Sequence, residues 1–275
     1  MLVRMLHPSF SPQQIASRSI SIAQQIEDIM TEARTAPIGA WSPSIDLPPE
    51  AAVARDARMA PIAASPALQT TELAAHLAAR LCHDFISPAS AILSGVDLLG
   101  DPTAQDMRDD ALNLISASAK KLGDMLAFAR VAFGASATAE TFDCESLKVL
   151  TEGVFAHVRP SLNWQVSLPT LPKPAARAIL NMAQIAASAL PTGGVAEARA
   201  ELDGGNISVV LDAVGTRARL RPEVLAGLRG EPLGEGLGGH WVQAYYLNAL
   251  VTAAGGRCST EVTEERVLLT ALLPQ

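Results

Sequence analysis

His83 is followed at once by a carboxylate, Asp84, and five residues later by a proline, Pro88. An exposed imidazole nitrogen can attack a phosphoryl group when a neighbouring acid orients the other ring nitrogen. Asp84 is placed to give that orientation, and the small Ser87 leaves space one turn further on. A proline inside a helix removes a hydrogen bond and kinks the axis, which frees the carbonyl of Asp84. The pattern predicts that His83 is a phosphoryl acceptor that Asp84 activates.

The segment around His83 has the pattern of an amphipathic helix over residues 71–100. Apolar residues recur at steps of three and four, as on one face of a helix. They are Leu77, Leu81, Phe85, Ala89, Ile92, Val96 and Leu99. The opposite face is a polar stripe of His76, Arg80, His83, Ser87, Ser90, Ser94 and Asp97. We expect His83 to face solvent in this stripe. The neighbours expected to contact a docking partner are Arg80, Phe85, Ile86 and Ser87.

A second helix is predicted over residues 102–133, with Asp101 as its N-cap and Pro102 in its first turn. Its apolar residues follow a heptad pattern, as in a helical bundle. They are Leu112, Ile115, Ala119, Leu122, Leu126, Ala129 and Phe133. Each helix of this hairpin has more apolar width than one partner covers, so a dimeric four-helix bundle is expected. The bundle contacts are assigned to Leu77, Leu81, Ile92, Leu112, Ile115, Leu122 and Leu126.

Residues 138–275 alternate between helical and strand patterns, which predicts an α/β sandwich and an α+β fold class for the whole. Asp203-Gly204-Gly205 is a hairpin signal between two strands, and Gly255-Gly256 stops a helix. The expected helices are 143–157, 172–190, one after Pro222, and 238–254. The expected strands are 163–168, 195–202, 206–213, 257–263 and 266–273.

Residues 1–70 differ from the rest, because Pro, Ala and Ser punctuate 36–67 as they do in linkers. We expect a disordered extension that contains at most a short amphipathic helix over 12–33. Met59, close to the start of the compact part, is an alternative start of translation.

The net charge and the cysteines argue against nucleic-acid binding, a cysteine metal site and a disulfide framework. The net charge of −7 argues against binding nucleic acid through its phosphates and favours a protein partner. Three widely spaced cysteines, Cys82, Cys144 and Cys258, form neither a metal motif nor a disulfide framework. No apolar run predicts a membrane span or a signal peptide, so a cytoplasmic protein is expected.

The other histidines have less distinctive surroundings. His76 lacks a following acid and a later proline, so we expect it on solvated surface. His157 and His240 are expected to be structural or exposed. Two alternatives to an acceptor remain for His83: an ordinary surface histidine, or a metal site with His76 and Asp84, for which the spacing is weak evidence.

Three segments carry a resemblance to a known family. HDFISP, from His83, is similar to the H-box of histidine-kinase dimerisation domains. ILNMAQIAASALPTGG, at 179–194, and GLGGHWVQAYYLNALVTAAGGR, at 236–257, lie where a kinase has its asparagine box and its second glycine box. Together they resemble the ChpT-type histidine phosphotransferases of alphaproteobacterial cell-cycle signalling. The resemblance covers about residues 71–275.

The departures from a working kinase concern the nucleotide boxes. The resemblance puts Ile185 where a kinase has its magnesium-binding Asn, and Ser188 where it has a Lys. An isoleucine offers no oxygen to magnesium. The adenine box keeps Asp212 but loses its glycine pattern, and the glycine run from Gly234 to Gly239 is weak evidence for phosphate binding. This implies a degenerate, Bergerat-type ATPase-like domain over 138–275, with no cofactor of its own.

The resemblance also implies the route of the phosphoryl group. His83 would accept it from the receiver aspartate of a hybrid sensor kinase and pass it to response regulators. The receiver would bring its own Mg²⁺. The alternatives are an ATP-dependent histidine kinase and a non-catalytic adaptor with an inert His83.

Overall fold

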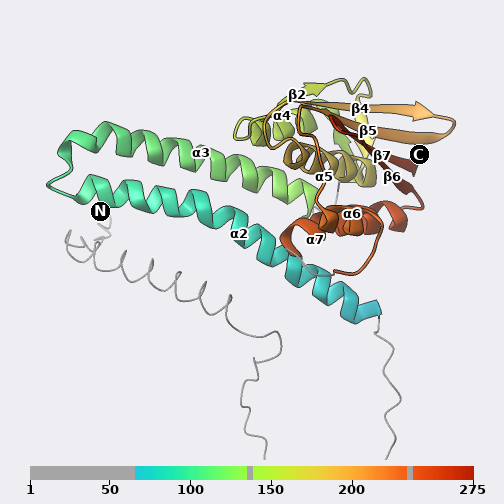
Figure 1. Ribbon diagram of the computed structural model, residues 1–275, viewed down its shortest axis with the longest axis horizontal. Helices are drawn as coiled ribbons and strands as arrows, with labels where there is room; N and C mark the ends of the chain where they lie inside the picture. Colours follow the sequence, from blue (N-terminus) through green and yellow to red (C-terminus); the bar gives the residue numbers. More distant parts are fainter. Residues whose placement is uncertain (1–65, 135–138, 234–237) are drawn as a thin grey trace, which may run out of the picture. The chain divides into compact units, whose positions relative to one another are not determined.

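The computed structural model describes residues 66–134, 139–233 and 238–275 (Figure 1). The described residues fall into two compact units. One contains Pro66 and Ser90–Ser116, and the other contains Ala67–Ala89 and Ala117–Gln275. The short helix expected over 12–33, and most of the extension expected to be disordered, lie outside the described residues.

The acceptor helix, α2, spans Pro66–Gly100 and contains Pro88. It begins five residues before the expected boundary at 71, so residues 66–70, which we assigned to the disordered extension, are helical. Proline is well suited to the first turn of a helix, because its fixed φ matches the helix and its missing N–H has no intrahelical partner there. Pro66 therefore marks the helix start that the apolar pattern alone did not show.

Asp101 does not cap the next helix, contrary to the prediction. Its Oδ1 accepts hydrogen bonds from the backbone N–H and the hydroxyl of Thr103, at 2.8 and 2.7 Å. Such local bonds from an aspartate favour a turn over a helix. After this turn comes a short 3₁₀ helix, η1 (Gln105–Met107), and only then α3, which spans Arg108–Ala132.

The buried face of α3 differs by one position from the predicted heptad. Ala111 and Ser118 are buried, whereas Leu112 and Leu126 are 47% and 48% exposed. In the unit that contains Ser90–Ser116, a Cβ added to Gly95 of α2 would lie 2.6 Å from Cγ1 of Ile115. The two helices therefore approach closely there, and small residues rather than leucines make that approach.

The α/β region has eleven further elements, all at or near their predicted positions except two very short strands. The helices are α4 (Cys144–Phe155), α5 (Lys173–Ala189), α6 (Pro222–Leu228) and α7 (Gly238–Ala253). The strands are β1 (Thr141–Asp143), β2 (Ser161–Trp164), β3 (Thr170–Pro172), β4 (Val195–Asp203), β5 (Asn206–Val214), β6 (Arg257–Val262) and β7 (Arg266–Pro274). Three-residue strands carry too little alternation to be seen in the sequence, so the sequence pattern does not predict β1 and β3.

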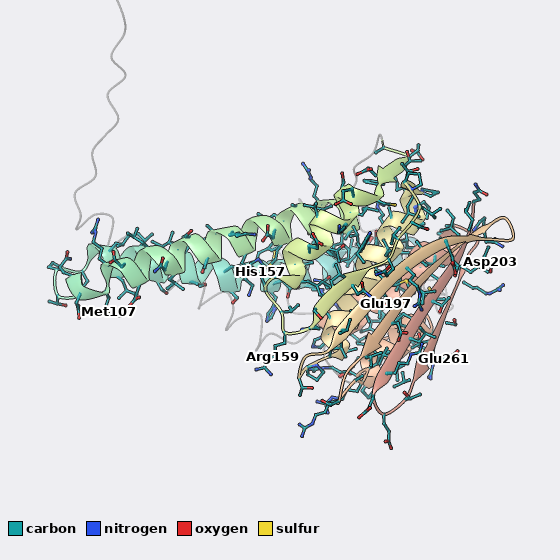
Figure 2. The ribbon with its side chains drawn as sticks, turned by 90° about the horizontal axis from the view of Figure 1, so that it is seen from above. Met107, His157, Arg159, Glu197, Asp203 and Glu261 are labelled. Carbon is teal, nitrogen blue, oxygen red and sulfur yellow. The ribbon has the colours of Figure 1, made fainter. Side chains whose placement is uncertain are left out.

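The main sheet has five strands in the order β2-β4-β5-β7-β6. β2 runs parallel to β4, and the other neighbours are antiparallel. The β4–β5 hairpin turns at Gly204 and Gly205, whose φ angles of 55° and 83° match the predicted glycine turn (Figure 2). Asp143 is the N-cap of α4, at the predicted start of this helix. Its Oδ2 accepts a hydrogen bond from the backbone N–H of Ser146 at 2.8 Å.

The core lies between the helices and one face of this sheet. α5 packs on β4 and β5, and it is buried along most of its length. Much of the contact is made by alanine. The buried alanines are Ala175, Ala176, Ala178, Ala183, Ala186 and Ala189 on α5, and Ala196, Ala198, Ala200, Ala213 and Ala271 on the strands. These small side chains explain how a chain with only 4% aromatic residues builds a packed interior.

Candidate functional site

His83 lies on α2 with 78% of its side chain exposed. Its Nδ1 is 3.4 Å from Oδ1 of Asp84, whose own side chain is 28% exposed. The position in solvent agrees with the prediction. Because Asp84 lies on the Nδ1 side of the ring, the geometry leaves Nε2 as the nitrogen free to meet a partner.

Arg80 does not lie on open surface, where we expected it to contact a partner. Its side chain is only 14% exposed. Nη1 donates to the backbone carbonyl of Gly239, at the start of α7, over 2.7 Å. Nε lies 3.5 Å from Oδ2 of Asp84. Burial lowers the pKa of Arg80, while the charge and hydrogen bond of Asp84 act in the opposite sense. The guanidinium therefore connects α7 to the acid beside His83.

His76 is another residue of the polar stripe that we placed wrongly. It is half-buried, and its ring meets the Trp241 ring edge-on, with centroids 5.7 Å apart. The first turn of α7 therefore covers the part of α2 that precedes His83. The sequence pattern of α2 alone could not show this, because the covering residues lie more than 150 positions away.

A cavity of about 390 Å³ opens beside His83. All its lining residues belong to the unit that contains Ala117–Gln275. They come from α2 (Arg80, His83, Asp84, Ser87), α3 (Lys121, Met125), the region of α4 (Val154, Phe155, His157, Val158), α5 (Gln184, Ile185, Ala187, Ser188), α6 (Val224) and α7 (His240, Gln243). Basic side chains outnumber acidic ones in this lining, although the chain as a whole has a net charge of −7.

Two of the lining residues are histidines whose roles the sequence left open. Nε2 of His157 lies 2.8 Å from Oδ2 of Asp124 on α3, so it joins two helices, as expected of a structural histidine (Figure 2). His240, on α7, has a lowered pKa because burial disfavours its charged form, and the charges of Arg221 and Arg80 add to that. No sequence signal marked His240 as a neighbour of His83.

The other predicted docking residues divide between surface and interior. Ser87 is exposed beside the cavity, and Ile86 is half-buried. Phe85 is also half-buried, and it lines a small inner cavity with Phe128 and Phe133. Phe85 therefore contributes mainly to packing, whereas Ser87 remains available to a partner.

The residues that the resemblance assigns to kinase nucleotide boxes include Ile185, Ser188 and Asp212. Ile185 is 2% exposed and lines the cavity with an aliphatic side chain. Ser188 donates its hydroxyl to the carbonyl of Ile185 at 2.7 Å. Asp212 faces away from the helices, on the outer face of β5, where both its oxygens bind Arg266 at 2.7 and 2.8 Å. Gly234 and Gly236 lie outside the described residues.

Neither a metal cluster nor a membrane helix is found in the part of the chain that the structure describes. Within residues 66–134, 139–233 and 238–275, no group of three or more His, Cys, Asp or Glu side chains could hold a metal ion. In the same ranges no helix is long and apolar enough to cross a membrane.

Comparison with known proteins shows the family of the chain. Residues 145–266 match the histidine phosphotransferase C-terminal domain family. The protein phosphotransferase ChpT of Brucella abortus (strain 2308) is 35% identical over 208 residues, which is 74% of this chain and 97% of that protein. A bacterial phosphotransferase of known structure aligns with a TM-score of 0.66 and 32% identity, over 73% of this chain and 96% of that one.

These similarities define the class of the protein as a histidine phosphotransferase of a two-component phosphorelay. The chain belongs to the ChpT family of protein phosphotransferases.

Proposed function

We propose that His83 is the residue that carries the phosphoryl group. The observation that supports this most directly is its 78% exposed ring with a carboxylate, Asp84, 3.4 Å from Nδ1. A carboxylate in that place favours the tautomer with the proton on Nδ1, and the lone pair then lies on Nε2. His76 and His157 are less exposed than His83: His76 is half-buried against Trp241, and His157, with 19% of its side chain exposed, pairs with Asp124.

The transfer step follows from this geometry. The Nε2 lone pair of His83 attacks the phosphorus of an aspartyl phosphate, and a new N–P bond forms. The P–O bond to the acyl oxygen breaks, and its electron pair leaves with the aspartate carboxylate. The ring gains positive charge and keeps its Nδ1 proton, which Asp84 stabilises. Onward transfer reverses these bonds on a second receiver aspartate.

The partners in this proposal are receiver domains. One belongs to a hybrid sensor kinase upstream, and others belong to response regulators downstream. The receiver would supply Mg²⁺, because a hard cation prefers several oxygen ligands and, among the residues that the structure describes, the lining of the cavity beside His83 contains a single carboxylate, Asp84. Receiver sites of this kind carry carboxylates, to which the basic lining of the cavity is complementary. Ser87 and Ile86 would contribute to docking.

We also propose that two copies of the hairpin form a four-helix bundle. Leu112 and Leu126 are half-exposed on α3 and lie two heptads apart, so they share one face of the helix. Packing against a second copy would bury these two heptad residues, which the contacts within one chain leave exposed.

The α/β region is proposed to serve docking rather than ATP binding. Asp212 is paired with Arg266 on the outer face of the sheet. The resemblance to kinases puts the buried Ile185 where a kinase has its magnesium ligand. Titration calorimetry with ATP and Mg²⁺ should therefore show no binding in the micromolar range. Micromolar affinity would favour the ATP-dependent kinase instead.

The test of His83 is phosphoryl transfer from a purified, phosphorylated receiver domain. The wild-type chain should acquire an acid-labile label, which peptide mass spectrometry should locate at His83. His83→Ala should abolish the label and leave the circular dichroism spectrum unchanged, because the side chain is mostly in solvent. His157→Gln, a histidine variant lining the same cavity, is the matched control and should still be labelled. A label that persists in His83→Ala would refute the assignment, and a wild-type chain that takes no label would favour the adaptor.

A further inference from the structure

Arg80 lies at the centre of a row of polar contacts that joins α7 to α2. The backbone carbonyl of Gly239 accepts its Nη1 at 2.7 Å. Its Nε lies 3.5 Å from Oδ2 of Asp84, and the other oxygen of Asp84 lies 3.4 Å from Nδ1 of His83. All four residues belong to the same compact unit.

We infer that Arg80 is a positioning residue: anchored to the Gly239 carbonyl, it holds the Asp84 carboxylate in place to orient the His83 ring. This inference rests on the proposed role of His83. It assigns the start of α7 a task in phosphoryl transfer, which acts through the backbone carbonyl of Gly239.

The burial of Arg80 is the reason that this role is favoured over direct docking. With 14% of its side chain exposed, the guanidinium has little surface to offer a receiver. A buried guanidinium is costly unless its donors are satisfied. Here the Gly239 carbonyl accepts from Nη1 and the Asp84 carboxylate lies beside Nε. The planar guanidinium fixes the directions of these two donors.

Asp84 needs such support because its own contact with His83 is long. Residues next to each other on a helix do not face one another, so an unrestrained carboxylate would turn away from the ring. The Nδ1 contact of 3.4 Å is at the outer limit of a hydrogen bond. A second contact that restricts the rotamer of Asp84 increases the fraction of time in which Nδ1 keeps the proton and Nε2 is the free nucleophile.

The experiment is a double-mutant cycle on the full chain, with rapid-quench transfer from a phosphorylated receiver as the rate measurement. The variants are Arg80→Gln, Asp84→Asn and the pair. Arg80→Gln should slow transfer by about 10- to 100-fold, the range typical of losing a group that orients a reacting side chain. Adding it to Asp84→Asn should cause no further loss, because Arg80 acts through Asp84.

The imidazole tautomer of His83 gives an independent readout. In ¹⁵N spectra, Arg80→Gln should shift the neutral ring toward the form with the proton on Nε2. A purely structural effect of the substitution would not move this equilibrium. Arg80→Lys retains the charge and the apolar stem, so it should fold even if Arg80→Gln does not, and its rate should lie between those of wild type and Arg80→Gln. Arg130→Gln, at an exposed position on α3, is the control and should match wild type.

Three results would overturn the inference. One is wild-type transfer and a wild-type tautomer in Arg80→Gln. Another, which applies if Arg80→Gln does not fold, is a wild-type transfer rate and a wild-type tautomer in Arg80→Lys. The third is multiplicative losses in the cycle, which would mean that Arg80 contacts the partner directly. Each of them leaves His83 labelled and His83→Ala unlabelled, so they are distinct from a failure of the proposed function.

Discussion

Gly227 allows α6 to lie against α7, and replacing it with alanine tests that packing. A Cβ at this position would lie 2.6 Å from the carbonyl oxygen of Trp241, 2.8 Å from Cβ of Ala244 and 2.8 Å from the backbone nitrogen of Tyr245. All three neighbours are backbone or Cβ atoms of α7. They cannot rotate away as the end of a long side chain can, so the two helices must separate by several tenths of an ångström.

The expected cost follows from that separation. Overpacking a well-filled contact costs about 1–3 kcal/mol, and rigid neighbours put Gly227→Ala near the upper end. Alanine recovers up to about 1 kcal/mol through its higher helix propensity. The net loss should be about 2 kcal/mol, which lowers the melting temperature of a domain of this size by roughly 4–8 °C.

Gly123→Ala is the matched control for this measurement. Gly123 lies inside α3, and a Cβ there would meet no atom within 4 Å. The same substitution should therefore raise the melting temperature slightly, through propensity alone. Calorimetric scans of both variants should move in opposite directions. If Gly227→Ala melts at or above the wild-type temperature, the reasoning from the α6–α7 contact is wrong.

Two further predictions concern the bundle and pH. Leu126→Glu should lower the mass measured by light scattering from that of a dimer to that of a monomer, whereas Val149→Glu, at a 59% exposed position on α4, should not; a dimer that survives Leu126→Glu would exclude this face. Burial lowers the pKa of His240 in the folded chain below its ordinary value of 6.5. The unfolded chain therefore binds the proton more readily than the folded chain does, and the free energy of unfolding should fall as the pH drops below about 6.5. His240→Asn should lose less of its urea midpoint between neutral and mildly acidic pH than wild type does, and an equal loss would contradict the assignment.

Local signals in the sequence were sufficient for most of the fold. The β4–β5 hairpin and the cap at Asp143 each depend on neighbours within a few residues. Their outcome could therefore be predicted from spacing and residue type. The error at Asp101 was also local: the same aspartate can cap a helix or close a turn, and Thr103 decides between them.

The surroundings of the site could not be predicted in the same way. His76 and Arg80 belong to a polar stripe, and nothing within α2 shows that Trp241 and Gly239 cover it. The buried face of α3 has a related cause, since Leu112 and Leu126 satisfy the apolar pattern while the small Ala111 and Ser118 are the residues that the chain itself buries. A pattern shows which residues prefer burial, but the partner surface determines which of them the chain itself buries.

The alanine-lined interior between α5 and the sheet has a consequence for how the sequence can vary. A buried leucine can drift to a smaller residue at a cost, whereas a buried alanine can lose only its methyl group. Almost every other substitution at Ala178 or Ala198 enlarges the side chain against a close neighbour. Substitutions at these buried alanines are therefore limited by the lack of space for a larger side chain. We expect relatives to differ more on the outer face of the sheet.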